Sequence, residues 1–227
     1  MLALPPVAAE ERPHAWPRDA KAIEAALGRL GLPVGAIDGI WDRDTARATC
    51  VWRELTGREV LRSWPLVDER RALKATTTFT VPTYMRVGVN INRQCQAGIW
   101  VTTGLVESAT TVESTTVTEL VRQRTVVRVM PASTGQSGVL ETHSGSFRVQ
   151  WAVNRWWQST IYADGLMYRP FFFNGGQALH GSSSDALVKW YPASHGCVRM
   201  LHADIDALWD AGFGRGDRVY VYGEWLG

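Results

Sequence analysis

The chain has 227 residues and a mass of 25.2 kDa, with 45% hydrophobic and 20% charged residues. This composition is typical of a globular protein and excludes a disordered or fibrous one, and 24 Lys and Arg against 22 Asp and Glu leave a net charge of only +2. We therefore expect no dedicated nucleic-acid surface, and since no segment approaches 18 consecutive apolar residues, no membrane-spanning helix either.

The length favours one large domain with a small additional module. Residues 1–15 are expected to form a tail, which starts with nine residues that include two prolines and carry no positive charge. These nine residues are therefore not an intact secretory signal.

Residues 16–78 are predicted to fold as a small bundle of three helices. Apolar residues recur at helical spacing in two stretches, Ile23, Ala26, Leu27 and Leu30, and then Ala48, Val51, Trp52 and Leu55. Asp42 or Asp44 can cap the second helix, and Gly31 and Gly57 follow the two stretches as stop signals. A third, short helix is expected near residues 68–73.

Residues 79–227 are predicted to form a mostly-β domain with one late helix, which makes the fold class α+β. β-Branched and aromatic residues alternate with polar ones in several short runs, for example Val87, Val89 and Ile91, Val127 and Val129, and Val219 and Val221. The late helix follows from the shared face of Leu201, Ile205, Leu208 and Trp209. The Thr-rich residues 102–123 favour an extended hairpin over disorder because their β-branched content is high.

The three cysteines are Cys50, Cys95 and Cys197. An odd number allows one disulfide at most and leaves one thiol that needs a reason. Cys50 and Cys95 can form a bridge between the helical module and the β domain, or remain two buried thiols. The sequence gives no distance that decides between these alternatives.

The most informative run is Ser-His-Gly-Cys-Val-Arg-Met at residues 194–200. A cysteine becomes a useful nucleophile when a base or positive group lies nearby, and His180 precedes Cys197 by 17 residues and is followed directly by Gly181. Backbone N–H groups in the turn around Cys197 can face a developing oxyanion. These residues supply a nucleophile, a base and oxyanion donors, which together suffice for acyl transfer.

This run, together with His180 and Gly181, closely resembles the active-site signature of the L,D-transpeptidases, the YkuD-type enzymes of bacterial cell walls. The resemblance extends to three further segments, which are Ala-Ser-Thr-Gly at 132–135, Thr-His-Ser-Gly-Ser-Phe at 142–147 and Tyr-Arg-Pro-Phe-Phe-Phe-Asn-Gly-Gly at 168–176. It covers about residues 79–223. Two features depart from the family pattern: His143 replaces the usual Pro, and the Thr-rich stretch is longer than a simple hairpin.

The resemblance implies that Cys197 attacks the carbonyl of the third residue of a peptidoglycan stem tetrapeptide and expels D-Ala. His180 is then the general base, and the carbonyl of Gly181 orients its ring. The N–H groups of Gly196 and Cys197 are expected to hold the oxyanion. For His195 the roles of base, substrate contact and loop brace remain open, and the remaining candidates are Ser194 as an orienting residue and Arg199, Tyr168 and Asn174 as substrate contacts.

No cofactor is expected. Zinc is the competing interpretation, because His180, His195 and Cys197 supply three possible ligands, but no HExxH-like spacing is present. An amine acceptor gives a 3→3 cross-link. Water as acceptor gives an L,D-carboxypeptidase, an alternative that includes a wall-degrading effector. A non-catalytic wall-binding protein is the further alternative.

The helical module also has a match. Its segment Asp-Gly-Ile-Trp-Asp-Arg-Asp-Thr at residues 38–45 resembles the core of the small peptidoglycan-binding helical module. The expected partners are thus peptidoglycan and, as inhibitors, carbapenems that acylate Cys197. The substrate further implies export to the periplasm or to the cell wall or extracellular space.

Overall fold

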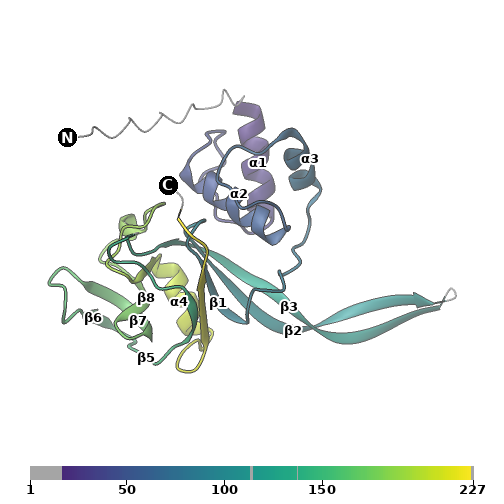
Figure 1. Ribbon diagram of the computed structural model, residues 1–227. Helices are drawn as coiled ribbons and strands as arrows, with labels where there is room; N and C mark the ends of the chain where they lie inside the picture. Colours follow the sequence, from purple (N-terminus) through teal and green to yellow (C-terminus); the bar gives the residue numbers. More distant parts are fainter. Residues whose placement is uncertain (1–16, 113–114, 137, 226–227) are drawn as a thin grey trace.

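The computed structural model describes residues 17–112, 115–136 and 138–225. The tail expected at residues 1–15 lies outside these ranges. Three helices come first, α1 (Pro17–Arg29), α2 (Arg43–Leu55) and α3 (Val67–Ala75), and they lie together on one side of the molecule (Figure 1). None of the helices among the described residues is long and apolar enough to span a membrane.

The helices form where the apolar spacing predicted them. Ile23 and Leu27 of α1 pack with Val51, Trp52 and Leu55 of α2 in one buried cluster. Of the two capping candidates, Asp42 is the N-cap of α2, and its carboxylate accepts a hydrogen bond from the Thr45 backbone N–H at 2.8 Å.

Among the described residues that follow α3, ten strands form one curled, mixed sheet. Nine of them follow the order β4-β10-β1-β2-β3-β9-β8-β7-β5, and β6 pairs with β7 at the end. The strands are β1 (Gly88–Asn92), β2 (Ala97–Val112), β3 (Thr115–Ser133), β4 (Gly145–Arg148), β5 (Trp151–Ala152), β6 (Trp156–Gln158), β7 (Leu166–Asn174), β8 (Gln177–Gly181), β9 (Val198–Met200) and β10 (Arg218–Tyr222). A short 3₁₀ helix, η1 (Asp185–Leu187), follows β8.

The late helix is present as α4 (His202–Asp210), directly after β9. Its apolar face presents Ile205 and Leu208 to a core that also contains Phe171, Leu179 and Val198 of the sheet. The α+β class, with helices first and a mostly-β part after them, is therefore confirmed.

The Thr-rich segment is an extended hairpin, as its β-branched content predicted. Strands β2 and β3 pair antiparallel from Ala97↔Pro131 as far as Val112↔Thr115, and their outer part projects away from the body (Figure 1). One bulge interrupts the pairing between Trp100 and Val101, where the register shifts.

The helices and the sheet share one apolar core. Met85, Cys95 and Ile99 of the β part belong to the same buried cluster as the side chains of α1 and α2. A disulfide joins Cys50 of α2 to Cys95, with a Cα–Cα distance of 5.6 Å. The bridge is thus the alternative that the structure supports, and Cys197 is the free thiol.

A buried carboxylate adds a polar link between the same parts. Glu54 of α2 accepts hydrogen bonds from the hydroxyls of Tyr84 (3.0 Å) and Tyr222 (2.7 Å) and from the Asn92 amide (2.8 Å). Burial raises the pKa of Glu54, while these three donors lower it. The helical part is therefore tied to β1 and β10 by hydrogen bonds as well as by the shared core.

The bridge leads to a prediction about thiols and stability. Denatured, unreduced protein should react with one equivalent of iodoacetamide per chain, and reduced protein with three. The double variant C50S/C95S should lose about 2–4 kcal/mol in a urea unfolding experiment, because the unfolded chain is no longer constrained over 45 residues. In the control C197S, the unreduced protein should show no reactive thiol and nearly unchanged stability; three thiols in the unreduced wild type would contradict the bridge.

Candidate active site

The loop that leads into Cys197 is held by three consecutive backbone carbonyls. The Lys189 carbonyl accepts from Arg47 of α2 at 3.2 Å, and the Trp190 carbonyl accepts from Arg62 at 3.3 Å. The Tyr191 carbonyl accepts from the hydroxyl of Ser133 at 3.0 Å. Two of the three donors come from the helical part, which therefore braces this loop.

The next residues of the loop are fixed on the end of β3. The N–H groups of Ala193 and Ser194 both donate to the Thr134 carbonyl, at 2.9 and 3.0 Å, and Gly135 forms a parallel bridge with Ser194. The chain then enters β9 through Gly196, whose φ of +108° suits glycine. A side chain there would also crowd the Gln177 amide, 3.1 Å from the position of a Cβ.

Parallel pairing brings the candidate base beside the candidate nucleophile. Strands β8 and β9 are neighbours, with Leu179 opposite Val198 and His180 opposite Arg199. Cys197 therefore lies one residue before the paired segment, and both Cys197 and His180 line the same cavity. The 16 intervening residues, 181–196, return the chain from β8 to the sheet at β9.

This cavity has a volume of about 360 Å³ and contains most of the residues predicted from the sequence. Those that line it are Cys197, His180, His195, Ser194, Arg199 and Asn174. The segment 159–167, which the sequence did not single out, forms a further part of the wall. From that segment Tyr162 stacks on the His195 ring at 4.4 Å, and the charge of Asp164 acts on Arg199.

Tyr168 does not line the cavity, against the expectation of a substrate contact. Its ring packs 4.4 Å from that of His202, and its hydroxyl donates to Asp206 of α4 at 2.9 Å. The register shift in β7 between Tyr168 and Phe171 accompanies this orientation toward the helix. Arg169, with a φ of +48°, lies within the same irregular stretch.

The His180 ring has a defined protonation pattern. Its Nδ1 lies 2.7 Å from the Gly181 carbonyl, which can only accept, so Nδ1 carries the proton and Nε2 keeps a lone pair. Burial lowers the pKa of His180 to about 4, and the charge of Arg199 also lowers it, while the bond to Gly181 acts in the opposite direction. The imidazole is therefore neutral at pH 7.

Cys197 is protonated in the resting state. Burial raises the pKa of its thiol, and the Ala178 amide and the positive charge of Arg199 offset this only in part. Its Sγ lies 3.5 Å from the Gly176 carbonyl. Because the pKa of His180 is lowered and that of Cys197 is raised, a resting thiolate–imidazolium pair is not favoured.

The backbone at the motif is already partly hydrogen-bonded. The Gly196 N–H donates to the Ser194 hydroxyl at 3.2 Å, so it is engaged rather than free for an oxyanion. The Gly196 carbonyl accepts from the Thr142 hydroxyl at 2.9 Å. In the part of the chain that the structure describes, the Cys197 N–H has no hydrogen-bond acceptor. Ser194 thus orients the turn, and Thr142 orients the peptide that carries the Cys197 N–H.

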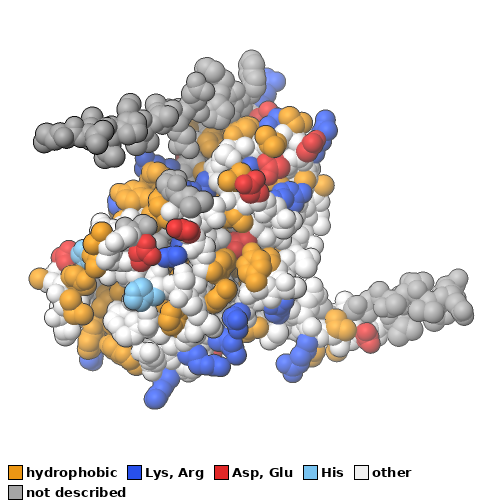
Figure 2. Space-filling model, in the orientation of Figure 1, with side chains coloured by type: hydrophobic (Ala, Val, Ile, Leu, Met, Phe, Trp, Pro, Cys, Tyr) orange, Lys and Arg blue, Asp and Glu red, His pale blue; other side chains and the backbone are white. Residues whose placement is uncertain are grey.

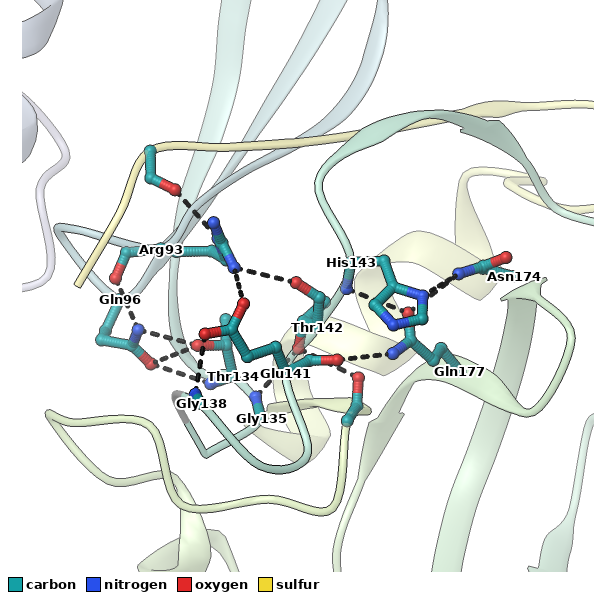
Figure 3. A network of polar contacts seen from close by, with 12 residues as sticks. Arg93, Gln96, Thr134, Gly135, Gly138, Glu141, Thr142, His143, Asn174 and Gln177 are labelled. Carbon is teal, nitrogen blue, oxygen red and sulfur yellow. Dashed lines mark hydrogen bonds and ion pairs between the residues drawn. The ribbon is translucent and has the colours of Figure 1, made fainter.

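Figure 3 shows the polar network that supports Thr142. The Thr142 hydroxyl also accepts from the Gly135 N–H at 2.9 Å, and its neighbour Glu141 forms an ion pair with Arg93 at 3.2 Å. Gln177 donates to the Glu141 carbonyl at 2.8 Å. These contacts hold the 141–143 turn against Gln177 at the start of β8.

His143, which stands where the resemblance leads one to expect Pro, belongs to the same network. Its backbone N–H donates to Gln177 Oε1 at 3.2 Å, a bond that Pro lacks. Its Nδ1 accepts from the Asn174 amide at 3.1 Å, and both side chains line the cavity (Figure 3). The turn therefore accommodates His143, and the side chain gives the cavity an additional polar group.

Across the described ranges, no three His, Cys, Asp or Glu side chains are grouped so that they could hold a metal ion. His180, His195 and Cys197, the three ligands considered for zinc, line the cavity without forming such a group. In Figure 2, several Lys and Arg side chains gather along the lower edge of the face in view, while above them positive and negative side chains are interspersed with hydrophobic and other ones.

Comparison with known proteins gives one family. The model of the YkuD family, the L,D-transpeptidase catalytic domain, matches residues 108–221. An L,D-transpeptidase crystal structure from Xylanimonas cellulosilytica is 28% identical, with a TM-score of 0.56 over 90% of this chain and 93% of that one. One from Stackebrandtia nassauensis is 19% identical, with a TM-score of 0.47 over 92% of each. None of the curated proteins matches the sequence.

Proposed function

The chain belongs to the YkuD family of L,D-transpeptidase catalytic domains, and from this premise we propose that Cys197 is the nucleophile that forms a thioester with a peptidoglycan stem tetrapeptide. The observation that carries the proposal is the cavity in which the only free cysteine of the described chain meets His180. The acceptor is proposed to be the side-chain amine of a second stem, which gives a 3→3 cross-link.

The proposed reaction starts from neutral groups. Sγ of Cys197 attacks the carbonyl of the third stem residue as its proton moves to Nε2 of His180, and the amine of D-Ala then leaves with that proton. The acceptor amine attacks the thioester, gives a proton to His180 and releases the product, which returns the thiol to Cys197. Each step moves one proton between the reacting groups and His180, so no cofactor enters the proposal.

The tautomer of His180 supports its role as the base, because the free lone pair is on Nε2 while Nδ1 is bonded to Gly181. The unengaged N–H of Cys197 is proposed as the main oxyanion donor, and that of Gly196 contributes only once Ser194 releases it. Arg199 and Asn174 in the cavity wall are proposed to contact the substrate, and His195, stacked on Tyr162, is proposed to contact it too.

Product analysis tests the function directly. The protein is incubated with a purified disaccharide-tetrapeptide and the products are separated and weighed by mass spectrometry. We expect a dimer that has lost one D-Ala. Tripeptide and free D-Ala without dimer would instead make the protein an L,D-carboxypeptidase, and no conversion would favour a wall-binding role.

We also propose domain roles and a compartment. Residues 16–78 are proposed as a peptidoglycan-binding module and residues 79–227 as the catalytic domain; the sequence match at 38–45 supports the first. The disulfide between Cys50 and Cys95 supports an oxidising compartment outside the cytoplasm. The helices share a core with the sheet. The helical part can therefore bind the substrate polymer and also support the catalytic loop.

Carbapenems are proposed to acylate Cys197, and the pH dependence of that reaction gives a prediction. His180 must be neutral to accept the thiol proton, and its pKa is lowered to about 4 from an ordinary value of about 6.5. As the pH falls, the acylation rate should therefore hold through pH 5.5 and decline with a midpoint near 4. Stopped-flow measurement with imipenem from pH 3.5 to 8, with far-UV circular dichroism to confirm folding, checks this; a midpoint between 6 and 7 would contradict it.

A further inference from the structure

His202, the first residue of α4, joins the chain that follows Cys197 to the chain that follows His180. Its Nε2 lies 2.6 Å from the Ser182 carbonyl, and because a carbonyl only accepts, Nε2 carries the proton. Its backbone N–H donates to the Asp185 carboxylate at 2.9 Å. One residue of α4 is thus bonded twice to the segment directly after β8.

These bonds lie just beyond the point where strand pairing ends. The parallel pairing of β8 and β9 stops at His180 opposite Arg199. His202 comes three residues after Arg199, and Ser182 two residues after His180. Beyond this last pair, strand pairing no longer fixes the two strands relative to each other. The contacts of His202 therefore extend the connection between β9, which follows the nucleophile, and β8, which carries the base.

The ring of His202 also packs directly on Gly181. A Cβ at Gly181 would overlap His202 Cδ2 and would lie 3.1 Å from Nε2, so only glycine leaves room for the ring. On its other sides the ring meets Tyr168 at 4.4 Å and Trp156 at 5.7 Å. The imidazole is thus enclosed by aromatic rings and by the backbone of residues 181 and 182.

Gly181 is the residue whose carbonyl accepts from His180 Nδ1. Its peptide is confined by the ring of His202, and the following carbonyl, that of Ser182, is bonded to the same ring. A peptide group is planar, so fixing the residues on both sides of the Gly181 carbonyl fixes its direction. That direction decides which nitrogen of His180 carries the proton.

We propose that His202 is a positioning residue that holds the Gly181 carbonyl and so keeps His180 in the tautomer with a free Nε2. This inference rests on the proposed function, in which Nε2 accepts the proton of Cys197. Many other residues could start α4 equally well, so the proposal gives His202 a role beyond its place at the start of this helix.

The test compares His202→Leu with His202→Gln. Leu fills similar space against Gly181 but cannot donate to the Ser182 carbonyl, whereas the Gln amide can. ¹⁵N NMR at pH 7 reports the tautomer of neutral His180, and mass spectrometry reports the rate of Cys197 acylation by a stem tetrapeptide. We expect one tautomer, protonated at Nδ1, in the wild type and in His202→Gln, with rates within about 3-fold of each other. For His202→Leu we expect mixed tautomers and a rate lower by about 10- to 100-fold, the scale of a misplaced catalytic group.

The matched control is Ala203→Ser, an exposed change on the same helix, which should alter neither readout. If His202→Leu does not fold, Gly181→Ala, which displaces the ring by its added Cβ, replaces it and should give the same result. An unchanged His180 tautomer in the folded variant overturns the inference, even if the rate falls. Failure of the wild type to form an acyl-enzyme at Cys197 would defeat the proposed function, while the tautomers in the resting protein would still decide the role of His202.

Discussion

Cys197→Ala should abolish acyl-enzyme formation and turnover, with a loss of at least about 10³-fold, because the variant has no nucleophile to form the thioester. In intact-mass analysis, the wild type should gain the mass of one bound carbapenem, and the variant none. With disaccharide-tetrapeptide, neither dimer nor tripeptide should appear above the level of a reaction without protein.

The variant should remain folded, which makes the loss interpretable. The Cys197 side chain is half-buried, its Sγ interacts with the Gly176 carbonyl at 3.5 Å and with the Ala178 amide, and the disulfide joins two other residues. The thermal midpoint should therefore change by only a few degrees. Cys197→Ser is the matched control: it keeps the shape of the side chain, yet a base with a pKa of about 4 cannot activate a hydroxyl effectively. Turnover retained by the Ala variant would require another nucleophile.

Much of the fold was predictable because local patterns determine it. The spacing of apolar residues predicted α1, α2 and α4, since a helix needs one apolar face to reach a core. The alternating, β-branched residues predicted the long hairpin of β2 and β3. What the sequence left open depended on distances through space. The bridge of Cys50 and Cys95 is the clearest case. The sequence is equally compatible with a disulfide and with two buried thiols, and the Cα–Cα distance of 5.6 Å in the structure decides for the disulfide.

The site was predictable to the extent that its residues share a short motif. Six of the nine predicted residues line the cavity, because residues 194–199 are contiguous and β8 places His180 beside them. Tyr168 lies elsewhere because irregular pairing of β7 turns its ring toward α4, and alternation along a regular strand does not describe such a stretch. His202 had no motif that set it apart from an ordinary helix start. Its role is indicated only by the contacts of its ring with Gly181 and with the Ser182 carbonyl, directly after His180.

The engagement of the Gly196 N–H by Ser194 was equally inaccessible to sequence reasoning. A turn of the type Ser-His-Gly-Cys indicates that N–H groups converge, but it does not indicate which of them a neighbouring hydroxyl already occupies. The segment 159–167 is a similar case. It forms a wall of the cavity only because β6 and β7 fold back beside the motif.

His180→Ala should reduce the rate of Cys197 acylation by on the order of 10²–10⁴-fold, the contribution expected of a general base. Stability is a separate effect, since the variant also removes a buried ring. His180→Asn is therefore the matched variant, because its amide can still donate to the Gly181 carbonyl but cannot accept a proton from the thiol. Both variants should lose rate to a similar extent, measured as the growth of acyl-enzyme mass with time.

The pH dependence of the residual rate separates a base from a structural residue. Without His180 the reaction must proceed from the small fraction of thiolate, and burial raises the pKa of Cys197. The residual rate should therefore rise about tenfold per pH unit through neutrality, because the thiolate fraction does so below the thiol pKa. The wild type should show a flat profile in that range, since neutral His180 is available at every pH well above 4. A flat residual profile in His180→Asn would mean that the thiol proton leaves by another route, and His180 would then only orient the site.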